Sequence, residues 1–117
     1  MKELLIVQSH PPHGTLYGQE GLDAALMASA FVTCRVLLLG DGIFQVLKGQ
    51  DSAQLGTKNY SVTYQALRDY GVTEIYCSEA DLARRGLETG DLLVDVMPLP
   101  DAAVGQLLRQ HQVVLSF

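Results

Sequence analysis

The chain lacks the features that mark secreted, zinc-stabilised and membrane proteins. It has only two cysteines, Cys34 and Cys77, which lie far apart without a Cys-x-x-Cys motif. This pattern argues against a disulfide framework and against a zinc site. No apolar run approaches the roughly 20 residues that span a bilayer, and the first residues have strand character rather than the pattern of a signal peptide. We therefore expect a reducing, cytoplasmic setting and no contact with a membrane.

Basic residues and nucleotide-binding motifs are also scarce. Eight Lys and Arg against thirteen Asp and Glu give a net charge of −5, and no basic run is longer than Arg84-Arg85. Direct binding of nucleic acid through phosphate contacts is therefore not expected. The chain has no Gly-x-Gly-x-x-Gly after its first strand, no P-loop, no His-Glu-x-x-His and no Gly-x-Ser-x-Gly. We expect neither a bound cofactor nor an enzyme of the types that these motifs mark.

Apolar residues, in contrast, are abundant for so small a protein. Hydrophobic residues make up 48% and charged residues 18% of 117 residues. A chain of this length forms a single domain, over residues 1–117, and buries enough surface for one core. The apolar excess has two compatible explanations. Part of the surface meets another subunit, or the sheet is covered by helices on both faces.

Strand and helix patterns alternate along the whole chain. This alternation predicts a three-layer α/β/α sandwich with a five-stranded, mostly parallel sheet, in an order that the sequence does not determine. A short helical segment at 43–47, ended by Gly49, and a polar loop at 51–59 interrupt the alternation. Ser78 is predicted to cap the third main helix in a capping box with Asp81, and Asp101 to cap the fourth. The predicted strands are 3–8, 35–39, 74–77, 92–97 and 113–117, and the main helices are 18–32, 60–70, 78–86 and 102–110.

Cys77 is the first candidate for chemistry. It ends a predicted strand and directly precedes a helix, so it lies at the carboxyl edge of the sheet, where ligands meet α/β folds. The helix dipole, with Arg84 and Arg85 on the same short helix, would lower the pKa of the thiol, and such a thiolate could accept or pass sulfur as a persulfide. The alternative, which we favour from the residues alone, is a small buried hydrophobic residue. Cys34, at the opposite edge, is expected to be structural.

Two histidines and an aspartate lie in loops at the same edge. His10 and His13 flank a Pro-Pro pair and could form an acid/base pair or half of a metal site. No Asp, Glu or Cys stands beside them at ligand spacing, so a rigid loop that bonds the backbone or a neighbouring subunit is the better interpretation, and we predict no metal site. Asp41, between two glycines after the second strand, could be catalytic, but Asp-Gly is also a common turn.

Several long motifs resemble one known family. The segment Pro12-His13-Gly14-Thr15, continued by Gly18-Gln19-Glu20-Gly21-Leu22-Asp23-Ala24, is similar to the DsrE/DsrF family of small sulfur-relay proteins, and within it to the TusC/DsrF branch. The resemblance runs from end to end of the chain. Further segments that carry it are 40–50, Cys77 with Arg84-Arg85-Gly86-Leu87, and Val113-Val114-Leu115-Ser116-Phe117.

The resemblance implies a subunit of a heterohexamer with two copies each of three related chains. The implied partners are TusB/DsrH-like and TusD/DsrE-like subunits and other sulfur carriers of the relay. In the Tus branch the assembly passes persulfide sulfur toward 2-thiolation of the tRNA wobble uridine, and in the Dsr branch a related assembly serves sulfur oxidation. The relay cysteine belongs chiefly to the D/E-type subunit, at a place similar to that of Cys77.

Two main hypotheses follow. As a structural subunit, the chain would present apolar helix faces and the loop 10–17 to its sister subunits, with catalysis mostly in those subunits. As a direct carrier, it would use Cys77, with Arg84 or Arg85 stabilising the thiolate. We favour the structural subunit. A free-standing small-molecule-binding domain is a third possibility, disfavoured by the missing phosphate loop. The candidate binding or interface residues are His10, His13, Tyr17, Asp41, Arg84 and Arg85.

Overall fold

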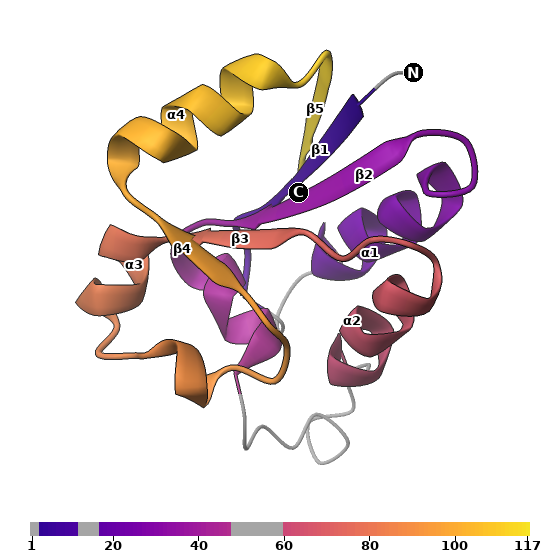
Figure 1. Cartoon of the computed structure of the whole chain (residues 1–117). Helices are drawn as coiled ribbons and strands as arrows, with labels where there is room; N and C mark the ends of the chain where they lie inside the picture. The colour runs from indigo at the N-terminus through magenta and orange to yellow at the C-terminus, as the bar shows by residue number, and fades with distance from the viewer. Residues whose placement is uncertain (1–2, 12–16, 48–59) are drawn as a thin grey trace.

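The sheet has five strands, all parallel, in the order β4-β3-β2-β1-β5 (Figure 1). The computed structural model describes residues 3–11, 17–47 and 60–117. The predicted fold class is confirmed, with a sheet that is wholly rather than mostly parallel. The strands are β1 (Glu3–Gln8), β2 (Thr33–Leu38), β3 (Ile75–Ser78), β4 (Met97–Leu99) and β5 (Val113–Ser116). The helices are α1 (Tyr17–Ala28), the 3₁₀ helix η1 (Gly40–Val46), α2 (Tyr60–Asp69), α3 (Glu79–Arg84), the 3₁₀ helix η2 (Thr89–Asp91) and α4 (Asp101–Gln110).

The two most apolar strands lie inside the sheet. β1 pairs with β2 from Glu3 beside Thr33 to Gln8 beside Leu38, and on its other side with β5. A strand that is paired on both sides and covered on both faces needs apolar residues at every position. This explains why Leu4 to Val7 form an uninterrupted run, and why all four are buried.

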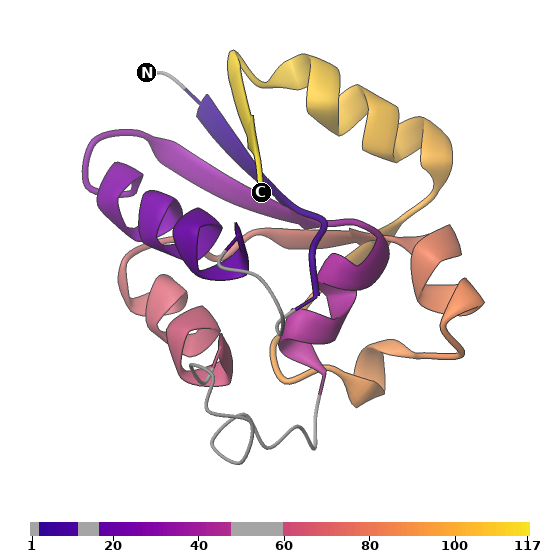
Figure 2. The same ribbon diagram turned by 180° about the vertical axis from the view of Figure 1, so that it is seen from behind.

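The two faces of the sheet are covered unequally (Figure 2). Leu4 and Ile6 belong to the larger core cluster, with Leu22 of α1, Leu67 of α2 and Leu82 of α3. The other face, with Leu5, Val7 and Leu37, packs against α4 through Leu107. β1 to β4 step across the sheet in one direction, whereas β5 returns to the side of β1. A right-handed crossover in the reverse direction places its helix on the opposite face, which explains the position of α4.

Two glycines allow α1 and η1 to approach the end of β1 closely. A Cβ atom on Gly21 would lie 2.3 Å from Nε2 of Gln8, and one on Gly42 would lie 2.0 Å from the carbonyl oxygen of Gln8. Neither distance leaves room for a methyl group. Both glycines fall in the segments that carry the family resemblance, and their role there is to permit this contact.

The predicted strand at 92–97 is wrong for most of its length. β4 begins only at Met97, where it pairs with Tyr76, and Leu92 forms an isolated bridge to Leu47. Continuing the β3–β4 register backward would set Asp95 beside Glu74, and like charges opposite each other destabilise a strand pair. Leu92 and Val96 instead turn their side chains into the larger core cluster.

Other boundaries also differ from the prediction. α1 ends at Ala28 rather than at 32, and α2 ends at Asp69 rather than at 70, where Tyr70 is 63% exposed. The N-cap of α4 is Pro100, so Asp101 is the first helical residue rather than the cap. Gly49 and the predicted loop 51–59 lie outside the described residues. In the described part of the chain, no helix is long and apolar enough to cross a membrane.

Candidate functional site

Cys77 is a buried thiol rather than an activated thiolate. Its side chain is 0% exposed and belongs to the larger core cluster. Burial raises the pKa of the thiol from its ordinary 9.0 to about 11, and the negative charge of Asp81 adds to this effect. Of the two interpretations given from the sequence, the buried position agrees with the favoured one, a small buried hydrophobic residue. Loss of water around the thiol outweighs the dipole of a six-residue helix, which would lower the pKa.

The residues around the start of α3 explain why a carboxylate lies near the thiol. Ser78 caps α3 as predicted, and its Oγ accepts a hydrogen bond from the backbone N–H of Asp81 at 3.1 Å. The Asp81 carboxylate does not complete the predicted capping box. Its Oδ2 accepts from the backbone N–H of Gly40 at 2.8 Å, and its Oδ1 accepts from Nη1 of Arg84 at 2.8 Å. Asp81 therefore joins α3 to the first residue of η1.

The two arginines point toward aspartates. Nη2 of Arg85 lies 2.9 Å from Oδ1 of Asp41, and its guanidinium lies 5.8 Å from the centre of the Phe44 ring. Arg84 bonds Asp81 within the same helix, and its side chain is 70% exposed. Neither arrangement is the predicted stabilisation of a thiolate. Arg85 instead makes a second link between α3 and η1.

We call Gly40, Asp41, Asp81 and Arg85 the α3 latch. Two of the predicted site residues, Asp41 and Arg85, thus meet in the latch, where they fasten α3 to η1, whereas Arg84 bonds Asp81 within α3. Sequence reasoning missed the part played by Gly40 and by the Asp81 carboxylate. The capping-box spacing pointed to Asp81, but it could not show that the carboxylate would bond a residue 41 positions away.

A second cluster of polar side chains, which the sequence analysis missed, lies at the end of β1. The hydroxyl of Tyr64 donates to Oε1 of Gln45 at 2.6 Å, and Nε2 of Gln45 donates to the carbonyl oxygen of His10 at 2.8 Å and lies 3.5 Å from Oε1 of Gln8. We call Gln8, His10, Gln45 and Tyr64 the Gln8 cluster. A glutamine closing the apolar run of β1 was the available signal. His13 and the side chain of Tyr17 lie outside the described residues.

A third polar network, also missed, lies under the end of α4. Arg35 forms ion pairs with Glu3 and Glu74, and its Nη1 lies 3.2 Å from Nε2 of His111. Nδ1 of His111 lies 2.8 Å from the carbonyl oxygen of Leu107. A carbonyl can only accept and a guanidinium can only donate, so these two contacts fit the His111 tautomer with its proton on Nδ1. It fastens α4 to the sheet.

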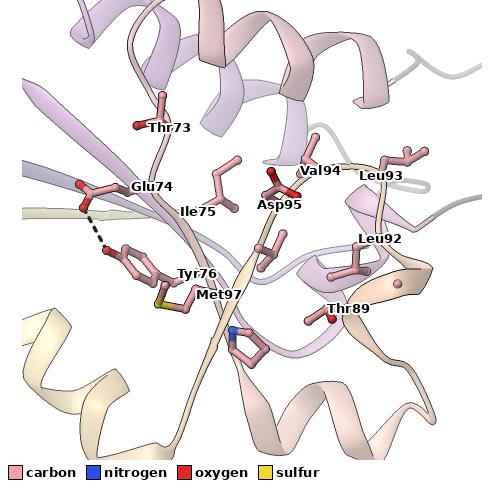
Figure 3. Close-up of a pocket in the computed structure, with 13 residues that line it drawn as sticks. Thr73, Glu74, Ile75, Tyr76, Thr89, Leu92, Leu93, Val94, Asp95 and Met97 are labelled. Carbon is pink, nitrogen blue, oxygen red and sulfur yellow. Dashed lines mark hydrogen bonds between the residues drawn. The ribbon is translucent and has the colours of Figure 1, made fainter.

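A cavity of about 840 Å³ opens between β3 and the segment 89–98 (Figure 3). Its walls are largely apolar, with Ile75, Val94 and Met97 among them. The two acidic residues on its wall already have partners. Glu74 accepts from the Tyr76 hydroxyl at 3.2 Å and pairs with Arg35, and Asp95 pairs with Arg68 at 2.7 Å. Within the described ranges, no predicted site residue lines this cavity, and no cluster of three His, Cys, Asp or Glu could hold a metal ion.

Comparison with known proteins identifies the family. Residues 2–117 match the DsrE/DsrF-like family. The chain belongs to this family. Among the proteins similar to this DsrE/DsrF-like chain is a "Protein TusC homolog" of Vibrio parahaemolyticus. The two are 34% identical over an alignment of 118 residues that covers 100% of each chain.

Solved structures share the fold of this DsrE/DsrF-like chain. The crystal structure of the ychN protein from E. coli matches with a TM-score of 0.86 at 21% identity, over 100% of both chains. A protein of unknown function from Methanobacterium thermoautotrophicum matches with a TM-score of 0.77 at 13% identity, again over 100% of both chains. At these identities the likeness concerns the fold alone. The resemblance stated from the motifs is confirmed by the family match and by the TusC homolog.

Proposed function

We propose that this chain is a structural subunit of a cytoplasmic sulfur-relay complex, of the kind that serves 2-thiolation of the tRNA wobble uridine. Similarity to a TusC homolog over the full length of both chains supports this assignment. The partners are a TusB/DsrH-like and a TusD/DsrE-like subunit, with further sulfur carriers downstream. Contact with the tRNA is made by other proteins of the pathway, since the chain is acidic and has no basic run beyond Arg84-Arg85.

The state of Cys77 is the observation that carries the structural role. A sulfur carrier needs a thiolate that a donor persulfide can reach. Cys77 has no exposed surface, its pKa is raised to about 11, and Arg85, one of the two arginines that could have stabilised a thiolate, is bound to Asp41. These features support a subunit that leaves sulfur transfer to its sister chains.

Apolar side chains at the surface support an association with such chains. Phe31, Met27 and Tyr70 are 84%, 75% and 63% exposed, and Val113 to Leu115 of the edge strand β5 are also exposed. Large apolar surfaces are costly in water and are found where proteins associate. These exposed side chains account for part of the high apolar content of the sequence.

One experiment separates the subunit from the alternative, a direct carrier. The purified chain is incubated with a low-molecular-weight persulfide, and its intact mass is recorded. Attack of the Cys77 thiolate on the outer sulfur would leave a Cys77 persulfide and release the donor thiolate. We expect no gain of sulfur, and tight co-purification with the two related chains when all three are co-expressed. A gain of one sulfur that is lost in Cys77→Ser but kept in Cys34→Ser would favour the carrier. A chain that stays monomeric beside its partners would refute the subunit role.

The second branch of the family, sulfur oxidation, is an alternative setting for the same subunit. Neighbouring genes distinguish the two. Two adjacent genes for short family members are expected in both cases, because the complex has three related chains. Sulfite-reductase genes beside them would favour sulfur oxidation over tRNA thiolation.

A further inference from the structure

Helix α3 is too short to be stable by itself. It has six residues, Glu79–Arg84, and one of them, Leu82, is buried in the larger core cluster. Isolated helices of this length do not persist in water, so α3 depends on contacts with the rest of the fold. Those contacts are the packing of Leu82 and the two links of the α3 latch, Asp81 to Gly40 and Arg85 to Asp41.

Cys77 is the residue before the cap of α3, Ser78, and its fully buried side chain belongs to the same core cluster as Leu82 of that helix. The register of β2 and β3 sets Leu38 beside Cys77, and η1 begins two residues after Leu38, so the end of β3 and the start of η1 are neighbours. Movement of α3 away from η1 would therefore expose Cys77 while β1, β2 and the Gln8 cluster stay in place.

The outer link of the latch, between Arg85 and Asp41, is weak enough to break without unfolding the protein. Their side chains are 21% and 53% exposed, and an ion pair so accessible to water is screened and contributes little. Local opening of such a segment takes less free energy than unfolding of the whole domain.

We propose that α3 is a cover over Cys77, held closed by the α3 latch, and that opening of this cover controls access to the thiol. The sheet stays folded during the opening. The latch thus determines how fast any reagent reaches Cys77. This inference concerns the chain by itself and does not rest on the proposed sulfur-relay role.

Alkylation of the full-length chain tests the cover. Iodoacetamide is added at pH 8, and labelling of each cysteine is followed by peptide mass spectrometry between zero urea and the onset of the unfolding transition. Local opening exposes little surface, so we expect Cys77 labelling to be nearly independent of urea. A labelling rate that rises with urea as steeply as the equilibrium constant for global unfolding would overturn the proposal, as would labelling as fast as that of a free cysteine.

Variants of the latch provide the second readout. Arg85→Met keeps an apolar stem over Phe44 but loses the ion pair, and Asp41→Asn removes the charge on the other side. We expect each to accelerate Cys77 labelling in zero urea about five-fold. Arg84→Met is the matched control, since Arg84 bonds Asp81 within α3 only, and its rate should change less than two-fold. Equal rates in all three variants and the unmodified chain would refute the latch, whatever the result with the related subunits.

Discussion

Two sets of polar residues, the Gln8 cluster and the α3 latch, lie at the carboxyl edge of the sheet and stabilise the structure in different ways. In the Gln8 cluster, the side chains of Gln8, Gln45 and Tyr64 are buried and carry no charge, and they bond one another and the backbone carbonyl of His10. The α3 latch lies at the surface and uses an aspartate and an arginine that water reaches. The first joins β1 to η1 and α2 inside the core. The second joins a six-residue helix to η1 from outside.

The difference lies in what replaces a broken bond. When an exposed ion pair opens, water solvates both partners, so the loss of free energy is small. When a buried amide loses its partner, no water takes its place, and the cost is the full desolvation penalty of that group. The Gln8 cluster should therefore be part of the stable core, whereas the α3 latch can open while the core remains intact.

The largest expected effect comes from Gly42→Ala, which pushes η1 away from the Gln8 cluster. The new Cβ would lie 2.0 Å from the carbonyl oxygen of Gln8, which is backbone and cannot rotate away. We expect a loss of about 5 kcal/mol in the free energy of unfolding, at the upper end for single substitutions. Urea denaturation measures it. Gly90→Ala, where nothing lies within 4 Å of the new atom, is the control. Equal midpoints for both variants would show that the contact is loose.

Leu22→Ala removes packing next to the Gly21 contact with Gln8. Leu22 is 1% exposed, so the substitution leaves a cavity under α1, and we expect a loss of about 3 kcal/mol, within the usual range of about 2–5 for buried leucines. Leu26→Ala, at a half-buried position of the same helix, should lose less. Denaturant melts read out both. If Leu22→Ala melts like the unmodified chain, α1 does not cover this end of the sheet.

Tyr64→Phe removes a single hydrogen bond from the Gln8 cluster. The Tyr64 hydroxyl is buried and donates to Gln45 at 2.6 Å, so Oε1 of Gln45 would lose this donor in the core. We expect a loss of about 1–2 kcal/mol, again from denaturation curves. Tyr70→Phe is the matched control, because the Tyr70 side chain is mostly exposed and should change stability little. Similar losses in the two variants would contradict the contrast between buried and exposed polar groups.

Local patterns predicted much of the fold. β1 has the predicted bounds, because a continuous apolar run followed by polar residues leaves little choice of register. The helices after β1 and β3 begin within one residue of the prediction, since Ser78 and the glycine-rich segment before α1 are strong local signals. The strand at 92–97 failed for a non-local reason. Its apolar pattern is strand-like, but pairing with β3 would bring Asp95 beside Glu74.

The candidate site also depends on contacts between residues far apart in the sequence, which local patterns do not predict. The sequence placed Arg85 on the short helix that follows Cys77, and α3 with its C-cap Arg85 occupies that position. Its partner Asp41 lies 44 residues earlier, on η1, and no local pattern connects them. The activated thiolate was the less favoured of the two interpretations of Cys77, and it assumed a free arginine. In the fold Arg85 pairs with Asp41, while burial and the charge of Asp81 raise the pKa of the thiol.

The smallest expected effect is that of Asp81→Asn on the pKa of Cys77. This substitution removes the negative charge of the latch but keeps the hydrogen bond that fastens α3. The Asn Oδ1 can still accept from the backbone N–H of Gly40, so α3 stays fastened while the negative charge near the thiol is lost. Asp81 is the second cause of the raised pKa of Cys77, after burial, so the pKa should fall but stay above its ordinary value. The ultraviolet absorbance of the Cys77 thiolate, followed against pH in a Cys34→Ser background, reads the closed state and should rise at lower pH than with Asp81 present. Asp41→Asn, which opens the cover, should instead raise the rate of iodoacetamide labelling and leave this absorbance midpoint unchanged. An unchanged midpoint in Asp81→Asn would mean that this carboxylate acts on Cys77 through the position of α3 and not through its charge.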